Sequence, residues 1–156
     1  MTYFAYFHLV INYGIIYWGN SSESNKIFLT QKEIVRIMTG SRPKTSSKPL
    51  FQSLGIVTIT SQYIFSLMKF LLQNQEKLTS NNEVHNINMR NKLKLLKTIS
   101  NLTLYKKGVY YMSIRIFNKL PDCIARLAEN KRSFLSTLRQ YLVIKSFYTL
   151  EEFFDD

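Results

Sequence analysis

The chain of 156 residues carries 21 Lys and Arg against 10 Asp and Glu, a net charge of +11, and 46% of its residues are hydrophobic. This apolar content excludes general disorder, because it can bury one core, though hardly two independent ones. The positive charge favours either a phosphate backbone or anionic lipid as the partner. We favour the phosphate backbone, because the sequence shows no long helix with the one-sided basic face that membrane-surface helices use. The alternative is that the charge serves solubility alone, without a ligand.

Neither the cysteine content nor the apolar opening segment indicates secretion or a membrane anchor. Cys123 is the only cysteine and cannot form an internal disulfide, which fits an intracellular protein in the cytoplasm or nucleus. The opening segment predicts a helix from about Thr2 to Trp18, apolar nearly all round, without a basic leader and shorter than the roughly 20 residues of a membrane span. We therefore expect a buried core helix.

A second helix is predicted from about Ser24 to Thr39, with Gly40 as its C-cap. Its apolar face is expected to hold Ile27, Ile34 and Met38, which recur at helical spacing. Lys32 and Arg36 lie one turn apart on another face.

Residues 41–49 form a basic loop, because its two prolines argue against a continuous helix. A short helix around Leu50 to Leu54 should end at Gly55, and Ile56 to Ile59 is either strand or loop. The next helix runs to about Asn74, with Ser61 as its N-cap and three inward residues, Ile64, Met68 and Leu71.

The stretch from Gln75 to Leu102 is rich in Asn, Lys and Ser and holds no sustained apolar period, so we expect a long mobile insert. No acid lies between Glu83 and Asp122. Eight cations lie there instead: Arg90, Lys92, Lys94, Lys97, Lys106, Lys107, Arg115 and Lys119.

The helical period returns at Tyr105, on a stripe with Val109, Met112 and Ile116, and Pro121 breaks it before a short helix from Asp122. A last amphipathic helix covers 133–145, with Phe134, Leu138, Tyr141 and Leu142 inward, and the tail 146–154 should pack its aromatic residues on the body. The expected fold is all-α, an irregular helical bundle with three parts: helical residues 1–74, the flexible insert 75–102, and helical residues 103–156 packing on the first part.

The sequence shows no arrangement of residues that is typical of an active site. The glutamates before Asp122 are scattered, whereas two-metal enzymes need converging carboxylates. His8 and His85 have no nearby Cys or acidic pair that would suggest zinc. The ending Phe-Phe-Asp155-Asp156 matches the aromatic-x-Asp-Asp pattern of a reverse transcriptase metal turn, but we interpret it as solvated terminal acids. We expect no enzyme activity, no metal and no cofactor.

Several segments in order are similar to a known family: Tyr-Gly-Ile-Ile-Tyr-Trp-Gly at 13–19, Gln-Lys at 31–32, Arg-Ile-Met-Thr-Gly at 36–40, Phe-Asn-Lys-Leu-Pro at 117–121, and 134–138. Together they span nearly the whole chain and resemble the thumb and C-terminal region of jockey-like non-LTR retrotransposon reverse transcriptases, which are RNA-directed DNA polymerases. Phe117 departs from the family, which often has Trp before Asn-x-Leu-Pro.

In that family the thumb is a helical bundle that follows the catalytic palm and grips the template–primer duplex by its backbone. The resemblance therefore implies a non-catalytic remnant or fragment that binds RNA or DNA without base specificity, with the palm upstream of Met1 as a further partner. The alternative is a helical protein–protein interaction module, without a nucleic-acid role, whose apolar first helix docks on a partner.

The expected phosphate contacts lie in the acid-free stretch, where the density of positive charge is highest. They are Lys92, Lys94, Lys97, Lys106 and Lys107. Arg42 and Lys44 form a second rim of the site. Tyrosines between the basic residues suit stacking on exposed bases, although tyrosines at helical spacing more often belong to a core.

Replacing all five of these lysines with Ala should remove most of the salt-dependent binding to duplex DNA, because each phosphate contact contributes about 0.9 to the log–log salt slope. The slope is measured by titrating binding against salt, and the helical circular dichroism should stay unchanged. An unchanged slope would show that this stretch is only a solvated face.

Overall fold

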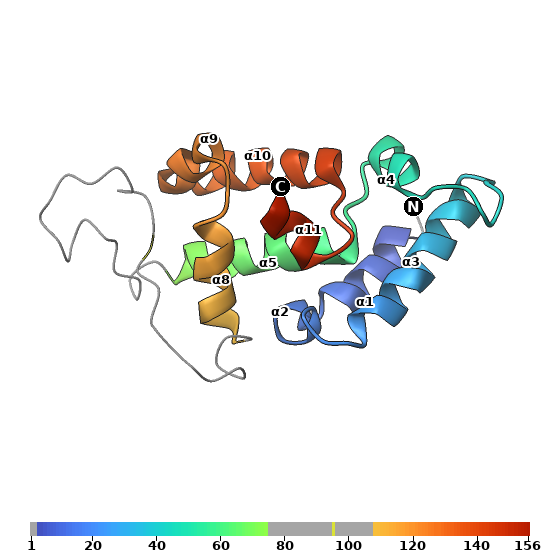
Figure 1. Cartoon of the computed structure of the whole chain (residues 1–156), viewed down its shortest axis with the longest axis horizontal. Coiled ribbons are helices and arrows are strands. Elements are labelled where there is room, and N and C mark those ends of the chain that lie inside the picture. Colours follow the sequence, from blue (N-terminus) through green and yellow to red (C-terminus); the bar gives the residue numbers. More distant parts are fainter. Residues whose placement is uncertain (1–2, 75–94, 96–107) are drawn as a thin grey trace, which may run out of the picture. The chain divides into compact units, whose positions relative to one another are not determined.

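The computed structural model describes residues 3–74, 95 and 108–156, and the regular elements within these ranges are helices (Figure 1). The all-α fold expected from the sequence is confirmed. The expected insert at 75–102 lies outside the described residues, apart from Leu95.

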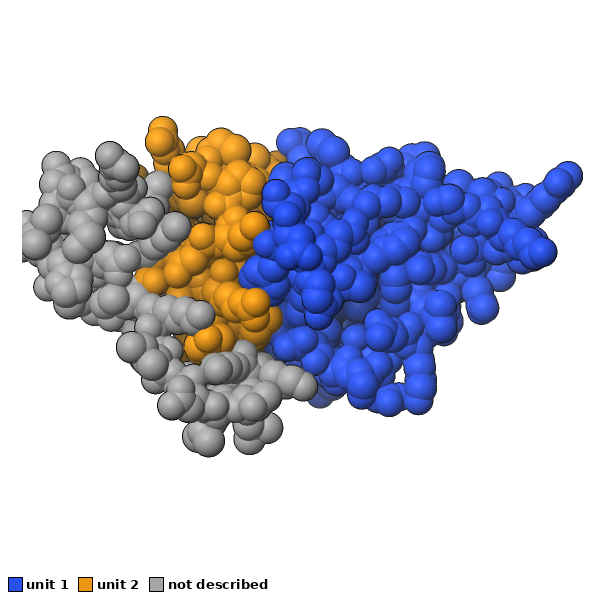
Figure 2. Space-filling model, in the orientation of Figure 1, with its two compact units in different colours: residues 1–63, 139–156 blue, residues 64–138 orange. Residues whose placement is uncertain are grey.

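Two compact units make up the chain (Figure 2). Unit 1 consists of Met1–Tyr63 and Arg139–Asp156, and unit 2 of Ile64–Leu138. Two helices, α5 (Ile59–Gln73) and α10 (Lys131–Lys145), contribute residues to both units. The expected boundary after 74 adjoins the residues that are not described and the one after 102 lies among them, so the three-part division stays a prediction.

The N-terminal segment of unit 1 is broken, where the sequence predicts one helix. A π-helical turn at Phe4–His8 leads into α1 (Leu9–Asn12), and α2 (Ile15–Trp18) follows after a break. At the break Gly14 has a φ of 63°, a left-handed conformation that suits glycine and interrupts a helix. The Trp18 indole Nε1 donates to the Tyr13 carbonyl at 3.0 Å and holds the two pieces together.

This segment is also not the buried core helix that its composition predicts. Tyr3, Ile11 and Ile15 are buried, but the opposite side is open to solvent, with large apolar side chains that are 64–87% exposed. These are Tyr6, Leu9, Val10, Tyr13 and Tyr17. The error arises because a uniformly apolar sequence has no periodicity to show which side is covered.

Helix α3 (Ser24–Met38) has the predicted length, but its buried face is offset by about one position. Phe28, Gln31 and Val35 are buried, whereas the expected Ile27 and Ile34 are half-buried and Met38 is 39% exposed. The helix ends as predicted: Gly40 is left-handed, and the next amide, Ser41 N–H, donates to the Arg36 carbonyl at 2.9 Å.

The short helix α4 (Lys48–Leu54) ends at left-handed Gly55, as the sequence predicts. Helix α5 begins earlier than predicted because Thr58, not Ser61, is its cap: the Thr58 hydroxyl accepts a hydrogen bond from the Ser61 amide at 3.2 Å. The inward residues Ile64, Met68 and Leu71 are buried, as expected.

Gln31 joins four segments of unit 1 through its buried side-chain amide. The Nε2 group donates to the Tyr3 hydroxyl at 2.8 Å and to the Val57 carbonyl at 3.0 Å. The Oε1 atom accepts from the Ile59 amide at 3.0 Å. The N-terminal segment, which runs beside α3 in Figure 1, is thereby linked to α3, to the α4–α5 connection and to the first residue of α5.

The C-terminal residues of unit 1 return to its core, as expected of the tail. Phe147 and Phe153 are each 1% exposed, and their ring centroids lie 5.3 Å apart. A short helix that the sequence did not predict, α11 (Leu150–Asp155), begins where the Thr149 hydroxyl accepts from the Glu152 amide at 3.1 Å.

Unit 2 contains α8 (Val109–Phe117), α9 (Asp122–Ala125) and a 3-10 turn (Arg126–Glu129), besides its parts of α5 and α10. Of the predicted core positions of α8 and α10, Met112, Ile116, Phe134, Leu138 and Leu142 are buried, whereas Val109 and Tyr141 are only half-buried. Asn118 binds both backbone groups of Leu95: Nδ2 donates to its carbonyl at 2.9 Å, and Oδ1 accepts from its amide at 2.8 Å.

No single helix in the described ranges is long and apolar enough to cross a membrane. Helices α4 and α5 reach that length and composition only together, across a bend of 51°.

Replacing Gln31 with Met should destabilise the fold by about 2–4 kcal/mol, because the buried Val57 carbonyl and Ile59 amide lose their partner and each unsatisfied group costs about 1–3 kcal/mol. The free energy of unfolding from urea titration measures this. Gln140→Met on the exposed surface of α10 is the matched control and should change stability little. Equal stabilities of the two variants would contradict the role of Gln31.

Candidate nucleic-acid interface

The sequence-predicted contacts fall in two places. Lys92, Lys94, Lys97, Lys106 and Lys107 lie outside the described residues. Arg42 and Lys44 are exposed on the 41–47 loop, and within the described ranges neither side chain forms a hydrogen bond or an ion pair. Both are therefore available to a ligand in this part of the chain.

Arg42 and Lys44 belong to a larger group of cations in unit 1, which we call the basic rim. It comprises Lys32 and Arg36 of α3, Arg42 and Lys44 of the loop, and Lys48 of α4. From residue 34 to residue 75 the sequence contains no acid, so no carboxylate in that stretch offsets the positive potential. This second acid-free stretch is a signal in the sequence that could have located four of the five rim cations, all except Lys32, although it holds fewer cations than the stretch after Glu83.

Arg36 fixes the loop beside the end of α3. Its Nε group donates to the Thr45 carbonyl at 3.0 Å, nine residues along the chain. The left-handed Gly40 reverses the chain between these two residues. A cation of the helix thus holds the loop that carries Arg42 and Lys44.

Lys32 lies over two aromatic rings. Its Nζ atom is 4.2 Å from the centroid of the Phe28 ring and 4.3 Å from that of Tyr148. Both distances are within the range of cation–π attraction, which restrains a lysine that would otherwise move freely. Burial, together with the nearby charge of Arg36, lowers the pKa of Lys32.

Lys48 differs from the other cations of the rim because it has an acidic partner. Its Nζ atom lies 2.7 Å from Glu152 Oε1, and Glu152 Oε2 accepts from the Tyr148 amide at 2.7 Å. Burial alone would raise the pKa of Glu152, but the hydrogen bonds from Lys48 and the Tyr148 amide, with the charge of Lys48, bring this pKa below its ordinary value. The pair therefore ties α4 to the start of α11.

The Tyr148 ring lies near two of the rim cations, Lys32 of α3 and Lys48 of α4. Its hydroxyl is hydrogen-bonded to the Ser47 hydroxyl at 2.9 Å, and its ring packs edge-on against Phe28 with centroids 5.0 Å apart. Lys48 lies 5.7 Å from the same ring. No sequence signal pointed to Tyr148, because about a hundred residues separate it from the cations around it.

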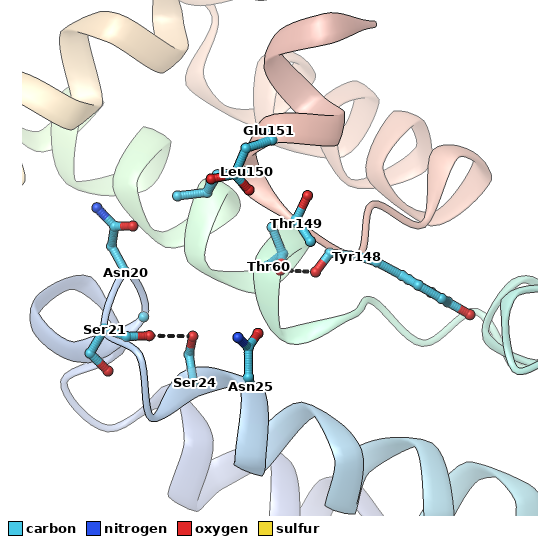
Figure 3. A pocket seen from close by; sticks show the side chains of 10 residues that line it. Asn20, Ser21, Ser24, Asn25, Thr60, Tyr148, Thr149, Leu150 and Glu151 are labelled. Atoms are coloured by element: carbon cyan, nitrogen blue, oxygen red, sulfur yellow. Dashed lines mark hydrogen bonds between the residues drawn. The ribbon is translucent and has the colours of Figure 1, made fainter.

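A polar cavity of about 160 Å³ lies on the other side of the Tyr148 backbone (Figure 3). The Tyr148 ring points away from it, while the Tyr148 carbonyl accepts from the Thr60 hydroxyl at 2.9 Å. Uncharged amides and hydroxyls dominate its lining, which includes Asn20, Ser21, Ser24, Asn25 and Thr60. Since Glu151 is its one charged residue, the cavity does not suit a phosphate.

The aromatic-x-Asp-Asp ending lies on a helix rather than in a hairpin. Asp155 is the last residue of α11, and the Asp156 carboxylate is bound by Lys145 and by the Tyr141 hydroxyl. In the described part of the chain, no group of three or more His, Cys, Asp or Glu side chains is arranged to hold a metal ion.

No protein-family model matches this chain, and no curated protein or solved structure is similar enough to identify a relative.

Glu152→Gln should lower stability at neutral pH by less than about 1 kcal/mol, because Lys48 and Glu152 are 40% and 39% exposed and solvent weakens their attraction. A carboxyl with a lowered pKa stabilises the fold above its ordinary pKa of 4.5, and this contribution disappears as the pH falls through the folded-state value. The urea midpoint of Glu152→Gln should therefore be lower than that of the parent protein at neutral pH, and the two midpoints should become equal in acid.

Glu151→Gln is the matched control, since this neighbour on α11 is exposed and has no ion pair among the described residues. It should leave the neutral-pH midpoint unchanged. If the urea midpoint of Glu152→Gln stays below that of the parent protein in acid, the charge of the Glu152 carboxylate is not the cause of the lower stability.

Proposed function

We propose that this protein binds the phosphate backbone of nucleic acid through the basic rim, without base specificity and without catalysis. The observation that carries the proposal is that four of the five rim cations, all except Lys48, lack an acidic partner among the described residues. Lys32, Arg36, Arg42 and Lys44 have no ion pair within the described ranges, whereas the chain does pair Lys26 and Lys48 with acids. Cations left unpaired and close to one another suit a polyanion.

Pre-organisation of the rim supports the same proposal. Two of its cations are already restrained, Lys32 by the aromatic rings beneath it and Arg36 by the Thr45 carbonyl. Ordering a long side chain on binding costs about 0.5–1.5 kcal/mol, so restraint in the free protein reduces that loss. Arg42 and Lys44 are carried on a loop that Arg36 holds, and they need only adjust their own side chains.

The family resemblance favours a duplex as the nucleic acid. The thumb of non-LTR reverse transcriptases holds template–primer by its backbone, and we propose that this chain is a non-catalytic remnant or fragment of such an enzyme, acting inside the cell. The resemblance rests on the ordered sequence segments alone. Two of these segments, Gln31–Lys32 and Arg36–Gly40, contain rim cations, and the other matching segments lie outside the rim.

The double variant Arg42→Gln, Lys44→Gln should lower the log–log salt slope for duplex DNA by about 0.9 for each phosphate that is no longer neutralised, and weaken all sequences alike. Both side chains are exposed, so the fold should be unaffected. Fluorescence anisotropy at a series of salt concentrations measures the slope.

The matched control, Lys26→Gln with Arg132→Gln, removes the same charge from exposed positions outside the rim. Its slope should stay near that of the parent protein. Equal reductions of the slope in both double variants would mean that the net charge, not the rim, attracts the polyanion.

A further inference from the structure

The N-terminal segment of unit 1 presents an apolar face that nothing in the described residues covers. We call it the aromatic stripe: Tyr6, Leu9, Val10, Tyr13 and Tyr17, which are 72, 64, 74, 87 and 79% exposed. Four of them, Tyr6, Leu9, Val10 and Tyr13, precede the break at Gly14 and recur at roughly helical spacing, and Tyr17 follows the break in α2. Contiguous exposed apolar residues of this size are uncommon on a monomer and mark an interaction surface.

The opposite side of the segment is firmly attached to the rest of unit 1. The Tyr3 hydroxyl accepts from Gln31, and the Asn12 side-chain oxygen accepts from Gln62 Nε2 at 2.6 Å. Ile11 and Ile15 are 4% and 1% exposed. The stripe therefore cannot turn inward without breaking these contacts, and it is presented as a fixed surface.

The charge pattern indicates what covers it. Residues 1–22 contain no Asp, Glu, Lys or Arg, whereas the whole chain has a net charge of +11. Two copies of this protein would repel each other across most of their surface, but a contact centred on the stripe keeps charge out of the interface core, as in protein interfaces generally.

The area of the stripe is also sufficient. A tyrosine buries about 150–250 Å² when fully covered, so three tyrosines at these exposures, with Leu9 and Val10, offer on the order of 600–800 Å² per copy. A specific interface of standard size buries about 800 Å² per partner. Tyrosine is moreover enriched in such interfaces, because its ring is apolar and its hydroxyl can reach the wet rim.

We propose that this protein forms a twofold-symmetric homodimer in which the aromatic stripes of two copies pack against each other. A twofold contact uses the same surface on both copies and closes after two subunits, so the assembly stops at the dimer. The proposal does not depend on nucleic-acid binding, because no residue of the basic rim belongs to the stripe.

Sedimentation equilibrium of the full chain tests the dimer. The fitted mass should approach twice the 18.4 kDa of the monomer as the protein concentration rises. Val10→Glu with Tyr13→Glu should weaken association by at least about tenfold, because it places carboxylates in an apolar contact without partners. Both positions are exposed, so the helical circular dichroism of the variant should match that of the parent protein.

Ile37→Glu with Ile144→Glu is the matched control, since these residues of unit 1 are 78% and 67% exposed and lie outside the stripe. This variant should still dimerise. Trp18, the only tryptophan, is hydrogen-bonded to the Tyr13 carbonyl, so its emission should change with dilution in the parent and control proteins but not in the stripe variant.

A parent protein that stays monomeric, assembles without limit, or associates equally weakly in both double variants would overturn the proposal. So would a monomer whose stripe binds lipid vesicles, which would assign the surface to a membrane. Salt titration of DNA binding on the stripe variant keeps the two proposals separate. Binding by a monomeric variant supports the rim alone, and a dimer that binds no DNA supports the stripe alone.

Discussion

One buried amide determines how unit 1 is assembled. Gln31 is 2% exposed and uses its NH₂ group and its oxygen on Tyr3, Val57 and Ile59, so none of these polar groups is left unsatisfied in the core. The three bonds have different directions and fix the rotation of α3 about its own axis. An apolar residue at position 31 could fill the same volume but could not select this rotation, because apolar contacts are not directional.

The rotation of α3 in turn sets what the surface offers. With Phe28, Gln31 and Val35 turned inward, Lys32 is placed at the edge of the core, over the Phe28 and Tyr148 rings, and Arg36 reaches the 41–47 loop. The same amide holds Tyr3 and thus the buried side of the N-terminal segment, which leaves its other side to solvent. The basic rim and the aromatic stripe are two consequences of one internal constraint.

The sequence predicts helix ends well and the orientation of faces less well. Gly40 and Gly55 are predicted correctly as helix ends because a left-handed C-cap is a local, chemical requirement. The predicted buried face of α3 is wrong because the pattern counts apolar residues only, and Gln31 is polar. The break at Gly14 is missed because apolar residues continue on both sides of it. Tyr148 could not be found, since its place between two lysines depends on the tertiary fold. The five lysines predicted as phosphate contacts, Lys92, Lys94, Lys97, Lys106 and Lys107, lie outside the described residues.

Unit 1 is built from two segments that lie far apart in the sequence, and this affects how the protein folds during synthesis. Its two segments, Met1–Tyr63 and Arg139–Asp156, flank all of unit 2 in the chain. Contacts such as Ser47 with Tyr148 and Lys48 with Glu152 close loops of about a hundred residues, which is slow because the entropic cost precedes the gain. On the ribosome, the N-terminal helices must wait until residues 139–156 have been made before their core is complete. Until then the Phe28 ring, which packs on Phe51, lacks its contact with Tyr148, and incompletely covered apolar surface of this kind makes a nascent chain prone to aggregation.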